Sequence, residues 1–228
     1  MRQPGLLIDE AVDSVILDGR TVAGTVTAES GYLYVLLNKP SGYLVTAADS
    51  RGRPTVYDLL RDIPRRVFPV GRLDLDTEGV LLLTDDGDLA HRLMHPRHEA
   101  VKGYRALVTG KVRQADLTRM VGGLSLEDGT ARARRALLES TTSVNSRLYI
   151  ELITGKKRQV KRMCAAIGHP VRKLRRVSFA GLTVHNVPIG EWRYLTVEEI
   201  TRLSNTSEKM SAKMSQKTSG KTSDLKTR

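Results

Sequence analysis

The feature that most constrains this chain is a polar turn, Gly71–Gly79, which places three carboxylates between two short apolar runs. The runs, Val67–Val70 and Val80–Thr84, have the length and composition of buried strands, and Asp85-Asp86-Gly87 ends the second one. Carboxylates this close together repel one another, so the turn predicts a nearby cation or a chemical use for them. A solvated acidic turn, in which Asp and Thr side chains bond to the local backbone, explains the same residues.

Further strands are predicted by β-branched and aromatic residues. They are Val15–Leu17, Tyr32–Leu37, Tyr104–Val108, Ala131–Leu138, Arg147–Thr154, Val171–Arg176 and Leu182–Val184. Helical patterns cover Thr55–Leu60, Asp88–Met94, Gln114–Val121, Lys157–Ile167 and a last segment from Thr196 to Leu203. The strands and helices follow in mixed order, without the regular alternation of a doubly wound fold. We therefore expect an α+β fold with a central, mostly antiparallel sheet and flanking helices.

The best-defined helix is Lys157–Ile167, because its apolar residues repeat at helical spacing. These residues are Val160, Met163, Cys164 and Ile167, and Gly168 follows as a left-handed stop. Three basic residues, Arg158, Lys161 and Arg162, lie off this apolar stripe. Lys161 lies at its margin, from which a long side chain can extend along the protein and reach into a cleft.

Positive charge is concentrated in one part of the sequence. The formal net charge is +12, and the segment 152–190 holds nine Lys or Arg residues and no Asp or Glu. Because surface helices usually interleave both signs, this basic block predicts a face that binds a polyanion. The start of a helix adds backbone N–H donors for a phosphate. Aromatic residues make up only 4% of the chain, which favours recognition of folded RNA by shape and phosphates over base stacking.

The 228 residues are enough for one domain or two small ones. We find neither a run of about eighteen apolar residues nor a signal peptide, so we expect a cytoplasmic protein. The single cysteine, Cys164, excludes an internal disulfide and is expected inside the helix just described. Residues 204–228 are rich in Ser, Thr and Lys and are expected to form a disordered tail.

Other chemistries have weaker support in the sequence. His91 and His95 have the spacing of a helical zinc pair, but the Glu of the HExxH pattern is missing, so we expect no metal site. We find no nucleophile elbow, phosphate-binding loop or dinucleotide fingerprint. Asp74 and Asp76 could form the carboxylate pair of a glycoside hydrolase, provided that both face one pocket. A non-catalytic RNA-binding or ribosome-assembly protein is the other alternative.

Four motifs follow one another along the chain in a specific order. They are Leu36-Leu37-Asn38-Lys39-Pro40-Ser41-Gly42, the run from Val70 to Thr84 with Gly71-Arg72-Leu73-Asp74-Leu75-Asp76-Thr77-Glu78-Gly79 inside it, Lys102-Gly103-Tyr104, and Gly155–Met163 followed by Val171, Leu174 and Arg176. Together they resemble the RsuA-type ribosomal RNA pseudouridine synthases. The resemblance extends from Tyr32 to Leu195 and so covers nearly the whole region expected to fold.

The resemblance implies an enzyme that converts selected uridines of ribosomal RNA to pseudouridine, with a pseudouridine synthase fold and an active-site cleft. It implies that Asp74 is the catalytic aspartate, that Tyr104 stacks on the target base and that Lys161 pairs with Asp74. Arg72 would hold the flipped-out nucleotide or fill the space it leaves, and Leu174 would line the pocket. A cation beside Asp74 favours its ionised form, which can act as a nucleophile or as a base.

Further substrate contacts are expected from the basic block, whose side chains would bind phosphates. These residues are Lys157, Arg158, Arg162, Arg172, Lys173, Arg175 and Arg176. The reaction breaks one glycosidic bond and makes another within a single nucleotide, so we expect no cofactor and no metal. The expected partner is ribosomal RNA or a ribosome assembly intermediate, with no membrane, and the protein is expected to be a monomer.

The resemblance also implies a division of the chain. Many family members begin with an S4 RNA-binding domain, and residues 1–30 resemble the linker or exit segment of such a domain, so we expect the domain itself to be missing from this chain. Residues 31–203 are expected to form the catalytic domain, and residues 204–228 the basic tail.

Overall fold

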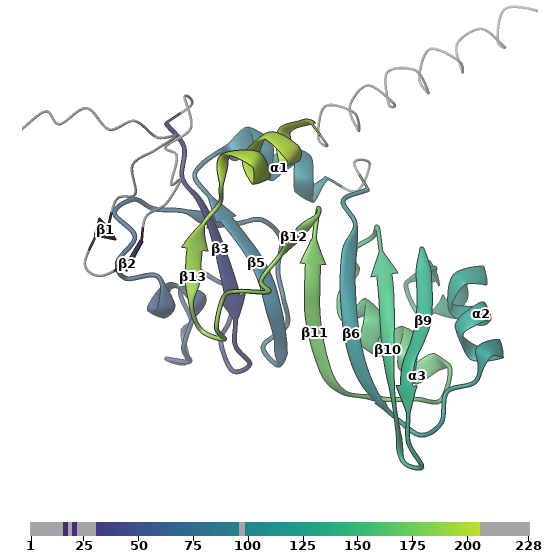
Figure 1. Ribbon diagram of the computed structural model, residues 1–228. Coiled ribbons are helices and arrows are strands. Elements are labelled where there is room, and N and C mark those ends of the chain that lie inside the picture. The colour runs from purple at the N-terminus through teal and green to yellow at the C-terminus, as the bar shows by residue number, and fades with distance from the viewer. Residues whose placement is uncertain (1–15, 18–19, 22–30, 96–98, 206–228) are drawn as a thin grey trace, which may run out of the picture.

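The computed structural model describes residues 16–17, 20–21, 31–95 and 99–205. Most of these residues surround one mixed sheet (Figure 1). Along this sheet the strands follow the order β13 (Trp192–Tyr194), β3 (Tyr34–Lys39), β5 (Thr77–Thr84), β11 (Val171–Phe179), β6 (Lys102–Thr109), β10 (Asn145–Leu152) and β9 (Arg135–Thr141). Neighbours in this order are antiparallel except β5 and β11, which are parallel.

Shorter elements complete the fold. β4 (Phe68–Pro69) pairs with β5, β12 (Leu182–Thr183) with β11, β1 (Ile16–Leu17) with β2 (Arg20–Thr21), and β7 (Leu124–Leu126) with β8 (Gly129–Ala131). The helices are the 3-10 helix η1 (Val56–Leu59), α1 (Gly87–Met94), α2 (Gln114–Gly122), α3 (Gln159–Ala166) and a helix over residues 197–205. None of the described helices is long and apolar enough to cross a membrane.

The half of the sheet that contains β3 and β5 is covered on both faces. Tyr34 and Leu36 of β3 pack with α1 and with the helix over residues 197–205. The alternate residues, Val35 and Leu37, pack on the opposite face against η1 and the chain around it. Burial on both faces explains why the sequences of these two strands are apolar without alternation.

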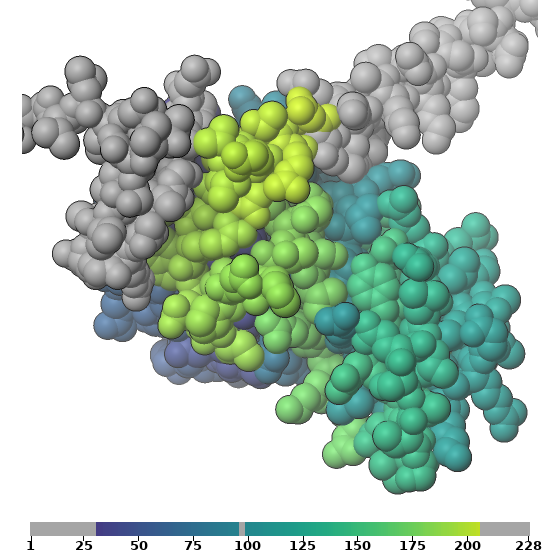
Figure 2. All heavy atoms as spheres, in the orientation of Figure 1, coloured from purple at the N-terminus to yellow at the C-terminus, as the bar shows by residue number. Residues whose placement is uncertain are grey.

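The half that contains β6, β10 and β9 is covered on one face only. Ala106 and Ile150 of the strands form a core with Leu117 of α2 and Met163 of α3. Along β10 the burial therefore alternates from residue to residue. The opposite face of these strands is not covered by any described helix, and Figure 2 shows it in teal and green on the near side of the molecule.

The predicted α+β fold with a central, mostly antiparallel sheet is confirmed. Most predicted elements are present with shifted ends. The predicted strand Ala131–Leu138 is wrong, because β8 ends at Ala131 and β9 begins only at Arg135. Between them, Ala133 donates its backbone N–H to the carbonyl oxygen of Met120 in α2 (2.8 Å) and so leaves the strand ladder.

Other differences have local causes. β7 and β13 were not predicted, because strands of three residues carry too little pattern. α3 begins at Gln159 and not at Lys157, because Arg158 has a left-handed backbone with φ of 50°. The segment Thr55–Leu60 forms a 3-10 helix and not an α-helix. The last helix continues to residue 205, beyond the predicted end at Leu203.

Some predictions fall largely or wholly outside the described residues. The predicted strand Val15–Leu17 is described only at Ile16–Leu17, where β1 is found. Of the expected linker, 1–30, only four residues are described, and residues 206–228 of the expected tail are outside the described part.

The parallel pairing of β5 with β11 fixes one end of the Gly71–Gly79 turn, called the carboxylate turn below. Thr77 and Gly79 of β5 lie opposite Leu174 and Arg176 of β11. Gly79 has a φ of +107°, and a Cβ at this position would lie 2.1 Å from the carbonyl oxygen of Arg176. Only glycine combines this backbone conformation with such a close approach of the two strands.

Gly79→Ala is therefore expected to lower the free energy of unfolding by about 2 kcal/mol or more, because it adds backbone strain to a clash with main-chain atoms. Urea unfolding measures the change. Gly87→Ala is the matched control, since Gly87 begins α1 without a left-handed backbone and a Cβ there meets no atom within 4 Å. The control should change the stability by less than about 0.5 kcal/mol, and equal losses in both variants would contradict the prediction.

Candidate active site

A buried lysine holds the backbone of the carboxylate turn. Lys39, the last residue of β3, is 0% exposed, and its Nζ donates hydrogen bonds to main-chain carbonyl oxygens. The acceptors belong to Pro40 (2.9 Å), Thr77 (3.0 Å), Asp74 (3.3 Å) and Leu75 (3.3 Å). An ammonium group has three N–H bonds, so at least one of them is shared between two acceptors. One side chain thus fixes the backbone at Asp74 and on its C-terminal side.

Two main-chain hydrogen bonds give the turn its shape. The N–H of Thr77 donates to the carbonyl oxygen of Asp74 (3.1 Å), which closes a four-residue turn. The N–H of Gly42, in the loop after β3, donates to the carbonyl oxygen of Leu75 (2.8 Å). Leu73 is buried in the core just before Asp74. The backbone that carries Asp74 is therefore held from both sides.

The positive charge of Lys39 also reduces the repulsion expected among the carboxylates of this turn. Burial lowers the pKa of Lys39 to about 8, while the nearby carboxylates of Asp76, Glu78 and Asp74 act in the opposite direction. The cation that the three carboxylates predicted is therefore present beneath the turn. We did not predict a role for Lys39 from the sequence, although a lysine that ends an apolar strand was an available signal.

Lys161 brings α3 into contact with the same turn. Its Nζ lies 3.3 Å from Oδ2 of Asp74 and also donates a hydrogen bond to Oδ1 of Asp76. The side chain of Lys161 is 12% exposed, that of Asp74 33% and that of Asp76 63%. One ammonium group thus pairs with two carboxylates, of which Asp74 is the more enclosed. We expected the contact with Asp74 and did not expect the contact with Asp76.

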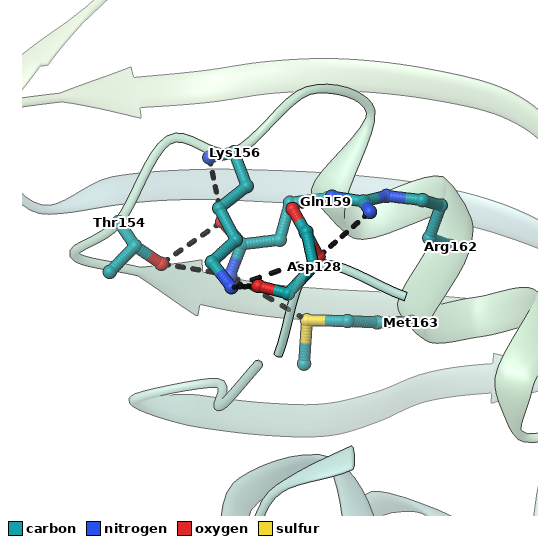
Figure 3. Close-up of polar contacts among 6 residues, drawn as sticks. All are labelled: Asp128, Thr154, Lys156, Gln159, Arg162 and Met163. Carbon is teal, nitrogen blue, oxygen red and sulfur yellow. Dashed lines mark hydrogen bonds and ion pairs between the residues drawn. The ribbon is translucent and has the colours of Figure 1, made fainter. Parts of the chain in front are cut away.

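The residues before α3 fix the point at which the helix begins (Figure 3). Gln159 is buried, and its Oε1 accepts a hydrogen bond from the backbone N–H of Lys156 (3.1 Å). The amide group of Gln159 also bonds to the hydroxyl group of Thr154, with 2.8 Å between Nε2 and Oγ1. These contacts tie the loop after β10 to the first turn of α3, and so they position Lys161.

An ion-pair cluster joins α3 to the turn between β7 and β8 (Figure 3). The Nη2 atom of Arg162 lies 2.9 Å from Oδ2 of Asp128, and its Nη1 atom lies 2.9 Å from Oδ1. Lys156 donates from Nζ to the carbonyl oxygen of Asp128 (2.7 Å). The hydrogen bond from Arg162 lowers the pKa of Asp128. An RNA phosphate would therefore have to compete with Asp128 for Arg162.

Tyr104 lies beside a buried arginine on the neighbouring strand. The register of β5, β11 and β6 places Gly79, Arg176 and Tyr104 in one cross-strand row. Arg176 is 2% exposed, donates from Nε to the carbonyl oxygen of Val80 (2.7 Å), and lies over the ring of Phe179 at 5.0 Å. Burial lowers the pKa of Arg176, and Tyr104 opposes this effect. Arg176 thus contacts Tyr104 from inside the protein and is not exposed to a phosphate backbone.

The other residues expected to bind substrate separate into two groups. Arg72 lies on the carboxylate turn, and Lys157 and Arg158 lie just before α3; all three are exposed. Leu174 is buried opposite Thr77 and packs in the core with α3. These positions are close in the fold to the pairing of α3 with the carboxylate turn.

The remaining group lies on β11 and points elsewhere. Lys173 lies opposite Leu107 of β6, and Arg175 lies opposite Arg105, on the sheet face that α3 does not cover. Arg172 is exposed at an irregularity in β11 and donates from Nη1 to Oδ1 of Asn145 (3.3 Å). The expectation that the basic block forms a single binding face is therefore wrong, because the block is divided between the two sides of the sheet.

Comparisons with known proteins add a family context. The model of the RNA pseudouridylate synthase family matches residues 33–166. An uncharacterized RNA pseudouridine synthase of Aquifex aeolicus is 41% identical over 204 residues, which cover 89% of this chain and 80% of the relative. The ribosomal large subunit pseudouridine synthase B of Bacillus subtilis is 42% identical over 173 residues, which cover 75% of this chain and 71% of the relative. A crystal structure of a pseudouridylate synthase matches with a TM-score of 0.66 at 34% identity, covering 75% of this chain and 74% of that one.

The hydrogen bond from Lys161 lowers the pKa of Asp76 against the opposing effect of burial. Lys161→Met is therefore expected to raise this pKa toward its ordinary value, as measured by an NMR titration of the carboxyl carbons. A carboxyl group whose pKa is lower in the folded state than in the unfolded state stabilises the fold at pH values above its unfolded-state pKa. This contribution is lost as the pH falls through the folded-state pKa. The variant should accordingly lose less stability on acidification.

Lys157→Met serves as the control for this titration. It removes the same charge from an exposed residue. Lys157 is not among the groups that shift the pKa of Asp76. The Asp76 titration should stay as in the parent protein. An Asp76 pKa that does not move in Lys161→Met would show that the two side chains do not pair in solution.

Proposed function

The chain belongs to the RNA pseudouridine synthase family, and we propose that it isomerises uridines of ribosomal RNA with Asp74, Lys161 and Tyr104 as the residues that carry the reaction. The enzyme class follows from the family. The choice of RNA and the roles of the residues are our proposal. One observation carries these roles: Lys161 meets Asp74 at 3.3 Å, at a point where both backbones are held in place.

The reaction exchanges one glycosidic bond for another within a single nucleotide. The bond between N1 of uracil and C1′ of ribose breaks, the base turns, and a bond forms between C5 and C1′. C5 loses its proton and N1 gains one, so the atoms balance without an external donor. What the protein must supply is a group that opens the first bond and a site that keeps the free base in place.

We assign the reactive carboxylate to Asp74 and not to Asp76. Asp74 is half as exposed as Asp76, and Lys39 and Thr77 both bond to its main-chain carbonyl oxygen. Charges interact more strongly where less water surrounds them, so water screens the ion pair of Lys161 with Asp74 less than the pair with Asp76. As a carboxylate, Asp74 acts as a nucleophile toward the sugar or the base, or as the base that removes a proton from the sugar.

The target base has to leave the RNA stack before it can react. We propose that it then lies against the ring of Tyr104, which is partly buried between two core clusters, with Leu174 as the apolar wall. Arg72, exposed on the carboxylate turn, holds the flipped nucleotide or fills the space it leaves. Lys157 and Arg158 contact the flanking phosphates beside the start of α3.

Two observations support ribosomal RNA as the substrate. The relative from Bacillus subtilis is named for the large ribosomal subunit, and the net charge of +12 suits a folded, phosphate-rich partner. The test is to map pseudouridine in ribosomal RNA from cells with and without the gene. At least one modified position should disappear on deletion and return only with an active copy. If every ribosomal position stays and one in another RNA disappears, ribosomal RNA is the wrong substrate although the family assignment stands.

Asp74→Asn is expected to fold and bind RNA but to lower the single-turnover rate by at least about a hundredfold, the usual scale for loss of a positioned catalytic group. Asp76→Asn is the matched control, two residues away and paired with the same lysine. Because exposed ion pairs contribute about 1 kcal/mol or less, the control should lose less than about tenfold. Pseudouridine formation on a stem-loop RNA measures both rates, and equal losses would contradict the assignment to Asp74.

A further inference from the structure

The sheet face opposite α3 carries several cations. We call it the open face and define it by the residues of β11, β6, β10 and β9 that alternate with those packed under α2 and α3. Its basic residues are Arg105, Arg135, Arg147, Lys173 and Arg175. Figure 2 shows this part of the surface beside the yellow-green C-terminal segment, with no described element lying over it.

The strand register places these side chains on one face. Lys173, Leu107 and Arg147 lie opposite one another on three adjacent strands. Residues opposite one another in register point to the same side of a sheet, and successive residues point to opposite sides. The successive residues here, Ala106 and Leu148, are buried in the core under α2 and α3. Lys173 and Arg147 therefore project on the side away from α3.

The charges of this face are only partly balanced. Arg105 lies opposite Arg175, an arrangement of like charges that destabilises a sheet, and it pairs with Glu139 at 2.8 Å. The other acid of the face, Glu151, accepts a hydrogen bond from the hydroxyl group of Tyr149 (3.0 Å).

The three other cations form no ion pair, although Arg135 lies opposite Glu151 on the adjacent strand. No ion pair among the described residues involves Arg135, Arg147 or Lys173. Unbalanced cations held on a rigid sheet cost stability unless an anion neutralises them. This is the charge pattern of a surface that binds a polyanion.

We propose that the open face binds the phosphate backbone of a double-helical segment of the RNA substrate, outside the part that delivers the target uridine to Asp74. A duplex fits better than a single strand, because the one aromatic ring in these rows, Tyr149, is partly buried and its hydroxyl group is bonded. The inference rests on the RNA substrate of the family and not on ribosomal RNA or on the role of Asp74.

The test compares two triple variants that remove the same charge. Arg135→Gln, Arg147→Gln and Lys173→Gln change the open face, whereas Arg51→Gln, Arg61→Gln and Arg119→Gln change exposed cations outside the sheet. The probe is an RNA hairpin with a stem of about 16 base pairs, the length that shape-reading domains span. Its Kd is measured by fluorescence anisotropy over a series of salt concentrations, after near-UV circular dichroism has shown that the variants are folded.

The open-face variant should weaken binding about tenfold or more at low salt, and its salt dependence should flatten by roughly 0.9 in log–log slope for each phosphate contact removed. The control should keep the parent slope. Equal slopes and affinities in the two variants would overturn the proposal. So would dimers of the parent protein that the open-face variant abolishes while RNA binding is unchanged, because a second copy of the chain would then occupy the face.

If the open-face variant fails to fold, Arg147→Glu alone replaces it, since this exposed residue makes no ion pair within the described chain. Charge reversal should weaken hairpin binding more than Arg147→Gln does, and equal affinities of these two variants would again overturn the proposal. The outcome is separate from the proposed function, because binding is measured on a hairpin that carries no particular target and pseudouridine formation by Asp74 is measured on a stem-loop.

Discussion

The burial of one ammonium group, that of Lys39, sets the geometry on which the proposed active site depends. Placing a charge inside a protein is costly unless hydrogen bonds and opposite charges compensate it. Here the compensation comes from the main-chain carbonyl group of Pro40, from three carbonyl groups of the Gly71–Gly79 turn and from the three carboxylates of that turn. The turn and the lysine therefore stabilise each other. This arrangement holds the backbone of Asp74 in place, while its side chain stays one-third exposed.

The two members of the proposed reactive pair come from different halves of the sheet. Asp74 belongs to the half built on β3 and β5, and Lys161 to the half covered by α2 and α3. The halves join where β5 runs parallel to β11, at a contact close enough to require Gly79. The same contact aligns Tyr104 with the end of the turn, two strands away. Strand pairing in the middle of the sheet thus helps to set the distance between the carboxylate of Asp74 and the ammonium group of Lys161.

Much of this could be predicted from the sequence, because the motifs are local. The carboxylate turn between apolar runs, the apolar stripe of α3 and the α+β class all follow from the spacing of neighbouring residues. The carbonyl contacts of Lys39 to the turn could not, although its place at the end of an apolar strand was a signal, since Asp74, Leu75 and Thr77 are 35, 36 and 38 residues away and approach it only when β3 pairs with β5. The break in the strand at Ala133 depends on a bond to α2. The division of the basic block also depends on register, because a count of charges does not tell which side of a strand Lys173 occupies.

The most direct test of the central assignment is a crystal structure of Asp74→Asn bound to an RNA stem-loop that contains the target uridine. The substitution keeps the size of the side chain and removes its charge, so the substrate should remain unreacted. The uridine should be flipped out of the stem, with its ribose against residue 74 and its base against Tyr104, and Lys161 should lie beside them. A uridine that stays stacked in the stem, or whose ribose lies away from residue 74, would contradict the assignment of Asp74 as the reactive group.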